Sequence, residues 1–230
     1  MLEATDIDFS YGGVRALSGV SLAARAGEIL CVTGRNGVGK TTLMRCVMGL
    51  EKAAGGSVTL DGVDVTKLAA EKRAAAGVAL VPQGRMIFPK LTVEENLRIG
   101  LQARRDGVKK IPAEIYDTFP ILRDFLKRKG GDLSGGQQQQ LAIGRAMAGG
   151  PKAMLLDEPT EGIQPNIIQE IGRVLQRLAA GGMAVVLVEQ YLDFVKEIGD
   201  RVAVMNRGSV VASGDMSVLT PELEREYLGV

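Results

Sequence analysis

Features typical of secreted and membrane-spanning proteins are missing from this sequence. Its 230 residues include only two cysteines, Cys31 and Cys46, in apolar settings, which excludes a disulfide framework and predicts reduced thiols in a cytosolic protein. The N-terminal residues show no basic segment followed by an apolar run, so we expect no signal peptide. The longest apolar runs, such as the one beginning at Met183, fall short of the ~20 residues that span a bilayer. If the protein serves a membrane process, we expect another chain to cross the membrane.

A strong excess of charge is also missing, and so is histidine. Lys and Arg together number 28 and Asp and Glu 27, which gives a formal net charge of +1. This balance argues against broad electrostatic binding, so we expect no nucleic-acid partner. Apolar residues make up 46% of the chain, and nothing in the composition indicates disorder. The length suits one large domain, or a core with an inserted subdomain.

The order of the predicted elements indicates an α/β fold. Strands are predicted over residues 2–11, 21–34, 78–83, 153–158, 183–190 and 201–206. Helices are predicted over residues 41–48, 92–104 and 112–127, after Pro165, and briefly after Thr220. Near-continuous apolar strands that alternate with helices predict a mainly parallel sheet. The mainly helical stretch from about 90 to 150 interrupts this alternation, and we interpret it as a subdomain.

Local signals add detail to this outline. Asp61 and Gly62 lie between two stretches of alternating apolar residues and indicate a hairpin. Thr92 with Glu95 predicts a capping box at the start of a helix.

The segment GRNGVGKT fits the phosphate-binding pattern G-x-x-x-x-G-K-[ST] at every fixed position. It follows a predicted strand and opens a predicted helix, so a glycine turn with an incidental lysine is the weaker reading. Its glycines let backbone N–H groups converge on an anion, and the helix N-terminus adds partial positive charge. The motif by itself does not choose between ATP and GTP. The residues expected to bind the nucleotide here are Gly34, Arg35, Asn36, Gly37, Val38, Gly39, Lys40, Thr41 and Thr42.

Two adjacent carboxylates end a later apolar strand and complete the predicted chemistry. Asp157 at this edge would orient Mg²⁺, together with the Thr41 hydroxyl. Glu158 would polarise the water that attacks the γ-phosphate, as a general base. Gln83 ends another strand, and its amide could reach the Mg²⁺ or the attacking water.

The segment DLSGGQQQQLAIGRA predicts a second site for an anion. Ser134 and Gln137 form a capping box for the apolar helix that follows. A cap does not need the paired glycines Gly135 and Gly136, which expose backbone N–H groups at the helix N-terminus. Two surfaces that can bind phosphate in one chain indicate a site that is completed between two chains.

The motif set resembles that of ATP-binding cassette (ABC) ATPases over essentially the whole chain. LSGGQ lies about twenty residues before LLDEP and about ninety after the phosphate loop, as in that family. The resemblance implies one ABC ATPase domain over residues 1–230. Its nucleotide-binding core covers 1–89 and 151–230, with an N-terminal antiparallel β subdomain, and a helical subdomain covers about 90–150. In this family two cassettes dimerise head to tail around two ATP molecules.

The resemblance also assigns roles and partners. It implies that Ser134 and Gly136 contact the γ-phosphate held by the partner's loop, and that Tyr11 stacks on adenine. Segments such as VPQGRMIFPKLTVEENL, DEPTEGIQPNIIQEIG and VEQYLDF are similar to those of branched-chain amino acid and urea importers. They most resemble the second ATPase subunit of urea importers. The implied partners are membrane permeases, a second ATPase subunit or a copy of this chain, and a periplasmic binding protein, with this chain peripheral on the cytoplasmic face of the inner membrane.

Two positions depart from the pattern of ABC ATPases. Most members carry a switch histidine where this chain has Gln190, and an aspartate where it has Gln164. Glutamine can donate to a phosphate oxygen but cannot carry the positive charge that histidine gains near neutral pH. We therefore expect weak hydrolysis by a symmetric homodimer, and a working heterodimer whose other ATPase supplies a histidine.

An apolar stretch near the predicted helical subdomain concerns the permease. It comprises Met86, Ile87, Phe88 and Leu91. One interpretation is that these residues pack against the subdomain. The resemblance implies instead that they line the groove for a cytoplasmic permease helix.

Other classes of function fit less well. An ABC ATPase of DNA repair would interrupt the cassette with long coiled coils, and one of translation would carry two cassettes. A GTPase would show N-K-x-D, which is missing, and would leave LSGGQ unexplained. The chain could also be a regulator that binds nucleotide without hydrolysing it. The intact pair Asp157 and Glu158 argues against this function, whereas Gln190 in place of the histidine leaves it open.

Overall fold

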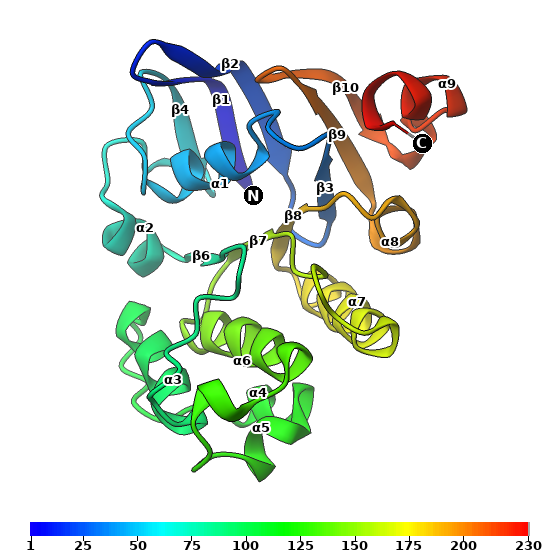
Figure 1. Ribbon diagram of the computed structural model, residues 1–230. Coiled ribbons are helices and arrows are strands. Elements are labelled where there is room, and N and C mark those ends of the chain that lie inside the picture. Colours follow the sequence, from blue (N-terminus) through cyan, green and yellow to red (C-terminus); the bar gives the residue numbers. More distant parts are fainter. Residues whose placement is uncertain (230) are drawn as a thin grey trace.

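The structure is a computed structural model that describes residues 1–229, and a six-stranded sheet forms its centre (Figure 1). The strand order is β10-β9-β3-β8-β7-β6. The strands are β3 (Ile29–Thr33), β6 (Val78–Val81), β7 (Ala153–Asp157), β8 (Ala184–Val188), β9 (Arg201–Asn206) and β10 (Ser209–Asp215). Every neighbouring pair is parallel except β9 with β10. The predicted mainly parallel sheet is confirmed.

A second sheet is antiparallel and has the order β2-β1-β4-β5. Its strands are β1 (Leu2–Tyr11), β2 (Val14–Ala24), β4 (Gly55–Leu60) and β5 (Val63–Asp64). Asp61 and Gly62 form the turn between β4 and β5, with φ angles of 50° and 78°. Two positive φ angles suit the twist of a two-residue hairpin, so the predicted hairpin is confirmed.

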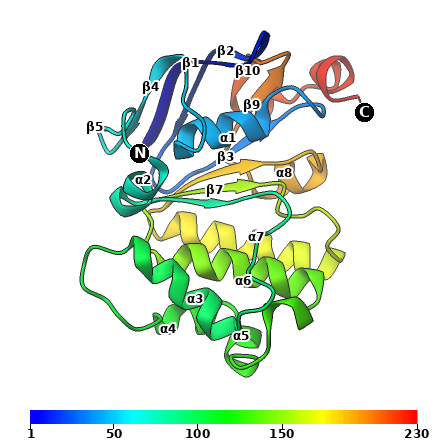
Figure 2. The same ribbon diagram turned by 60° about the vertical axis from the view of Figure 1, so that its left-hand side comes forward.

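Side chains pack on both faces of the six-stranded sheet, and every residue of β3, β7 and β8 is buried. On one face, Leu30 and Val32 pack with residues of the antiparallel sheet and of α1 (Lys40–Met48). On the other face, Cys31 packs with residues of α6 (Gly135–Ala148) and α7 (Pro165–Ala180). Figure 2 shows these layers, with α1 above the strands and α6 and α7 below them. Burial on both faces explains why the strands are apolar throughout.

Residues 93–148 are mainly helical and lie on the α7 side of the sheet (Figures 1 and 2). Besides α6, the helices here are α3 (Val93–Gly100), α4 (Ala113–Thr118) and α5 (Pro120–Asp124). The capping box of Thr92 and Glu95 is present at the start of α3. Asn96 is fully buried in α3 and ties the preceding loop to the helix, because it accepts from the Phe88 N–H and donates to the Phe88 carbonyl O, at 2.8 and 3.0 Å.

Two predicted helix boundaries are wrong. The helix expected over 92–104 ends at Gly100 and continues as a 3₁₀ turn, Leu101–Ala103. The helix expected over 112–127 is divided into α4 and α5, because Pro120 has no N–H to donate and disfavours helical geometry at the preceding residue. Residues 21–34 read as strand with turn glycines, and the structure has a turn at Gly27, where φ is 88°, between β2 and β3.

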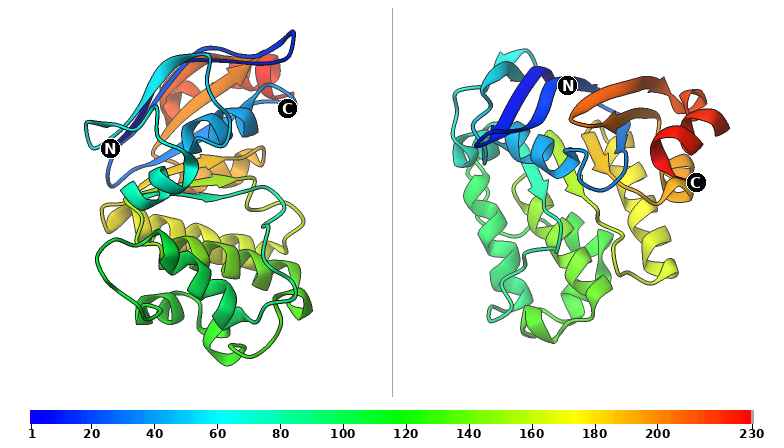
Figure 3. Two further views of the ribbon diagram at one scale, coloured as in Figure 1. Left: turned by 90° about the vertical axis from the view of Figure 1, so that its left-hand side faces the viewer. Right: turned by 45° about the horizontal axis from the view of Figure 1, so that its top comes forward.

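Several elements are not predicted by the sequence. They are α2 (Ala70–Ala76), α8 (Leu192–Ile198) and β10. The final helix after Thr220 is short, α9 (Pro221–Leu223), and a π-helical turn, Glu224–Leu228, follows it. This C-terminal segment lies beside β9 and β10, at the end of the molecule away from α3 to α6 (Figure 3). Within residues 1–229, no helix combines the length and the apolar character needed to cross a membrane.

Candidate functional site

The loop between β3 and α1 makes a tight turn that requires glycine at two positions. Gly34 and Gly39 have φ angles of 152° and 107°. A Cβ at Gly34 would lie 2.4 Å from the carbonyl O of Met205, and one at Gly39 would lie 2.7 Å from that of Ala16. Backbone conformation and space therefore both exclude other residues. The phosphate-loop pattern is satisfied here by a rigid turn at the carboxyl end of β3.

Lys40 begins α1, and its side chain is only 4% exposed. Its Nζ donates to the carbonyl oxygens of Gly34 and Arg35, at 2.7 and 3.0 Å, and lies 3.8 Å from Oε1 of Glu158. Burial lowers the pKa of Lys40, whereas the carboxylates of Glu158 and Asp157 raise it. The ammonium group is therefore enclosed by oxygen atoms at the base of the loop.

Asp157, the last residue of β7, has features that fit a metal-bound water. It is 3% exposed, and its Oδ1 has no hydrogen-bond partner. Burial raises the pKa of Asp157, and the side chain of Thr41 acts in the opposite direction. Within residues 1–229 no three His, Cys, Asp or Glu side chains gather as a metal site. A Mg²⁺ ion here would therefore depend on phosphate and water for most of its oxygen ligands.

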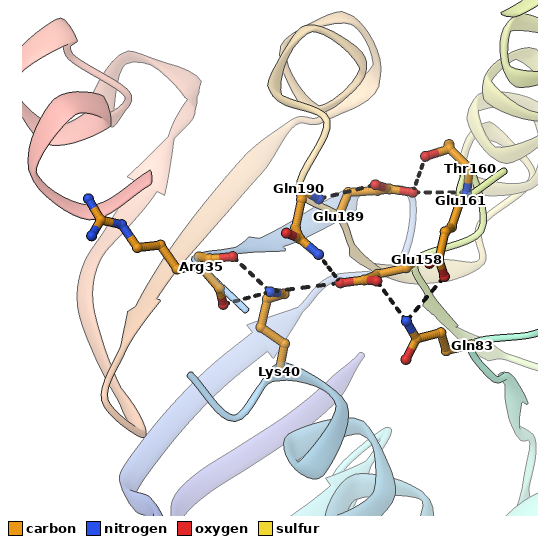
Figure 4. Close-up of polar contacts among 9 residues, drawn as sticks. Arg35, Lys40, Gln83, Glu158, Thr160, Glu161, Glu189 and Gln190 are labelled. Carbon is orange, nitrogen blue, oxygen red and sulfur yellow. Dashed lines mark hydrogen bonds and ion pairs between the residues drawn. The ribbon is translucent and has the colours of Figure 1, made fainter. Parts of the chain in front are cut away.

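The Glu158 carboxylate is held by two amides and by Lys40 (Figure 4). Nε2 of Gln83 donates to its Oε2 at 2.9 Å, and Nε2 of Gln190 donates to its Oε1 at 2.5 Å. Glu158 has a positive φ of 48°, which is uncommon for a residue with a side chain. Its N–H donates to the carbonyl O of Val188 at 2.9 Å. The carboxylate of Glu158, just after β7, thus meets the amides of Gln83 and Gln190, which lie just after β6 and β8.

A cavity of about 510 Å³ opens beside this point. Among the residues that line it are Tyr11, Asn36, Gly37, Gly39, Lys40, Thr41, Thr42, Gln83 and Glu158. Tyr11 is 49% exposed, and its ring packs edge-on against Phe9 with 4.7 Å between centroids. The fold therefore gathers most of the predicted nucleotide-binding residues around one open space.

The structure does not bring the serine–glycine segment to this cavity. Ser134 caps α6 and shares a capping box with Gln137, as predicted. A Cβ at Gly135 would lie 3.2 Å from the guanidinium of Arg85, and one at Gly136 would lie 3.1 Å from Ile167. The glycines thus also permit close packing within the chain. None of the four residues 134–137 lines the cavity, which is consistent with a surface offered to another chain.

Two phosphate-loop residues direct their side chains elsewhere. Nη2 of Arg35 donates to the carbonyl O of Glu226 at 3.4 Å, so this side chain points to the C-terminal segment (Figure 4). Val38 is buried in the core. In this conformation, only the backbone groups of these two residues are available to bind an anion.

One residue of the site, Glu189, was not predicted from the sequence. It directly follows β8, is 3% exposed, and accepts hydrogen bonds from Thr160 and from the backbone of Gln190. Burial raises the pKa of Glu189, and these hydrogen bonds oppose the shift. A glutamate directly after the apolar run AVVLV was the available signal, because it places a carboxylate at a buried sheet edge.

A larger cavity of about 990 Å³ lies next to the site, between α1 and the helical segment. Exposed apolar side chains line it, namely Leu50, Met86, Phe88 and Ile99. Of the predicted apolar stretch, Met86 and Phe88 are 64% and 45% exposed here, whereas Ile87 packs against the core. Thr41, Gln83 and Asp157 also line the groove, so it is continuous with the site.

Comparisons with known proteins fit this geometry. Residues 17–161 match the profile of the family described as ABC transporter. The high-affinity branched-chain amino acid transport ATP-binding protein BraG of Pseudomonas aeruginosa is 37% identical over 232 residues, covering 100% of both chains. A probable branched-chain amino acid transport ATP-binding protein, LivF of Archaeoglobus fulgidus, is 34% identical, covering 99% of this chain and 98% of that one. The dimeric structure of a post-hydrolysis ATP-binding cassette bound to ADP and phosphate has a TM-score of 0.83 at 26% identity, covering 94% of this chain and 99% of that one.

Proposed function

The chain belongs to the ABC transporter family, and on that basis we propose that it is the ATP-hydrolysing subunit of a solute importer. Members of this family are ATPases that energise transport, and their fold is the one seen here. The observation that carries the proposal is the convergence of Lys40, Asp157 and Glu158 at the carboxyl edge of the sheet. This edge is where parallel α/β sheets bind their ligands.

The geometry supports a role for each residue. The phosphate loop and Lys40 would bind the phosphates of ATP, with Tyr11 against the adenine. Mg²⁺ would be held through Thr41, Gln83 and the unpartnered oxygen of Asp157, and would neutralise phosphate charge. Glu158 would accept the proton of the attacking water. The remaining residue, Gln190, would exchange its hydrogen bond with Glu158 for one to the γ-phosphate.

We also propose that each ATP lies between two chains. Ser134 is exposed and Gly136 is partly buried at the N-terminus of α6, and neither lines the cavity of its own chain. The dimeric, ADP-bound cassette with a TM-score of 0.83 supports this arrangement. The division into a nucleotide-binding core (1–89 and 151–230) and a helical subdomain (about 90–150) is part of the same proposal, because the latter would carry Ser134 to the partner's site.

The partner ATPase is proposed to be a different chain. Gln190 donates to Glu158 but cannot supply the charge of a switch histidine. The test is to isolate the transporter through a tag on this chain and to identify the subunits by mass spectrometry. We expect two permeases and a second ATPase that carries the histidine. Full ATP-driven transport by permeases reconstituted with this chain alone would contradict the proposal.

The proposed solute is a branched-chain amino acid or urea. Full-length similarity to BraG and LivF supports branched-chain amino acids. The glutamine run at 137–140 and the segments 161–165 and 188–194 support urea through their resemblance to that importer. In vesicles that contain the isolated transporter and its binding protein, labelled leucine and labelled urea would be compared for ATP-dependent uptake. Uptake of one of the two assigns the solute, and uptake of neither contradicts both.

The groove beside the site is proposed to receive a cytoplasmic helix of the permease. Replacing Phe88 with aspartate should abolish coupled transport and leave ATP affinity unchanged. The physical reason is that the half-exposed ring lines the apolar groove, whereas a carboxylate there would have to be desolvated when the helix docks. Uptake in vesicles and ATP binding to the purified chain measure the two effects. Val63→Asp, at a more exposed apolar residue outside the groove, is the control, and undiminished uptake by Phe88→Asp would rule out the assignment.

A further inference from the structure

A buried carboxylate beside Gln190 has no role in the function proposed above. Glu189 follows β8 directly, and only 3% of it is exposed. Its N–H donates to the carbonyl O of Val32 at 3.2 Å, so its backbone extends the pairing of β8 with β3. Charged side chains are rarely this buried unless hydrogen bonds compensate for the lost water. The partners of this carboxylate therefore indicate what it does.

Both oxygens of Glu189 accept hydrogen bonds, and the donors lie on two separate loops. Oε1 accepts from the N–H of Thr160 at 3.0 Å and from its hydroxyl at 2.7 Å. Oε2 accepts from the N–H of Gln190 at 3.1 Å. Thr160 belongs to the turn that starts at Glu158, where the N–H of Glu161 donates to the Glu158 carbonyl at 3.3 Å. One carboxylate thus joins the loop after β7 to the loop after β8 (Figure 4).

The donor set fits an ionised carboxylate and no other side chain of that size. The backbone N–H groups of Thr160 and Gln190 can only donate, and the Thr160 hydroxyl donates here as well, so both oxygens of Glu189 act as acceptors. An amide in its place would turn an NH₂ group toward Thr160 or toward the backbone of Gln190. A buried donor would then face another donor and stay unsatisfied, which disturbs the contact on that side.

We infer that Glu189 is a positioning residue, which holds the loops of Glu158 and Gln190 in the relative placement that hydrolysis needs. This inference rests on the proposed function, because it takes Glu158 to be the base. The positive φ of Glu158, 48°, is a conformation that persists only when surrounding contacts support it, and Thr160, held by Glu189, lies two residues further along the same turn. Glu189 does not line the nucleotide cavity, so it acts through Thr160 and Gln190.

The test uses the whole transporter, isolated through a tag on this chain, with the base of the second ATPase replaced by glutamine. Steady-state hydrolysis over a range of ATP concentrations then reports this chain's site. Glu189→Gln should lower kcat by about 10–100-fold, as the loss of groups that orient reacting side chains often does. The KM for ATP should change by less than about threefold, because the phosphate loop is untouched. Thr160→Val, which removes one donor and keeps the shape, should lower kcat less. The kcat of the double variant should be no lower than that of Glu189→Gln alone, because both substitutions break the same contact, between Glu189 and Thr160.

Asp200→Asn provides the matched control. Asp200 also accepts from a backbone N–H, that of Ile29 at 2.8 Å, but at the opposite end of β3. This variant should keep the kcat and KM of the wild type. A wild-type kcat in Glu189→Gln, or a KM that rises as much as kcat falls, would overturn the inference. If that variant does not fold, an unchanged kcat in Thr160→Val overturns it. Wild-type transporter that hydrolyses no ATP would instead refute the proposed function.

Discussion

Replacing Glu158 with glutamine should lower the rate of ATP hydrolysis by about 10²–10⁴-fold, the usual effect of removing a positioned base. The side chain lines the cavity and lies 3.8 Å from the ammonium of Lys40. Glutamine has nearly the same shape but cannot accept a proton from water. ATP affinity should be retained, because none of the phosphate-loop glycines changes. Titration with a fluorescent ATP analogue and a phosphate-release assay measure the two quantities, on isolated transporter in which the base of the second ATPase is also replaced by glutamine, so that only this chain's site turns over.

Glu161→Gln is the matched control for this variant. The Glu161 carboxylate accepts from the same amide, Nε2 of Gln83, at 3.1 Å, but it is exposed and makes no ion pair with Lys40. It should hydrolyse ATP at a rate within about threefold of the wild type, as expected of a change to an exposed side chain that has no part in the proposed chemistry. A near-normal rate in Glu158→Gln would show that the base lies elsewhere. Equal losses in both variants would point to the hydrogen-bond network of Gln83.

The part of the site that could be predicted from the sequence is the part that is contiguous in the chain. The phosphate loop requires glycine at Gly34 and Gly39 for a local reason, namely backbone angles that other residues avoid. The capping box of Ser134 and Gln137 is equally local, because both partners lie in one helical turn. The ABC ATPase fold class is confirmed for a related reason, since continuous apolar strands between helices leave few arrangements open.

The contacts that escaped prediction join residues that are distant in sequence. Glu189 meets Thr160 only because β7 and β8 are neighbours in the sheet, and no pattern along the chain states that order. The two glycines of the serine segment illustrate the same limit. The sequence suggested an anion site alone, whereas the structure shows that Gly136 also lets α6 approach Ile167. Among the elements, α2 escaped because its residues, AEKRAAA, lack apolar periodicity.

Replacing Lys40 with methionine should weaken ATP binding by about 10²–10³-fold. A point charge about 4 Å from a phosphate oxygen contributes roughly 4 kcal/mol at an effective dielectric near 20, and the backbone N–H groups of the loop retain part of the attraction. Methionine keeps the apolar stem of the buried side chain, so packing changes little. The loss should be larger for ATP than for ADP, because the lysine of this motif reaches the β- and γ-phosphates. Calorimetric titration of the purified chain with each nucleotide measures both affinities.

Lys152→Met tests whether any loss of a lysine has this effect. Lys152 is exposed and pairs with Asp61 at 3.0 Å, and it does not line the nucleotide cavity. Both nucleotides should bind this variant as they bind the wild type, since an exposed ion pair contributes little and is far from the ligand. Equal losses for ATP and ADP in Lys40→Met would place Lys40 away from the γ-phosphate. A loss below about tenfold for both would mean that the backbone of the loop, and not the ammonium group, supplies most of the attraction for phosphate.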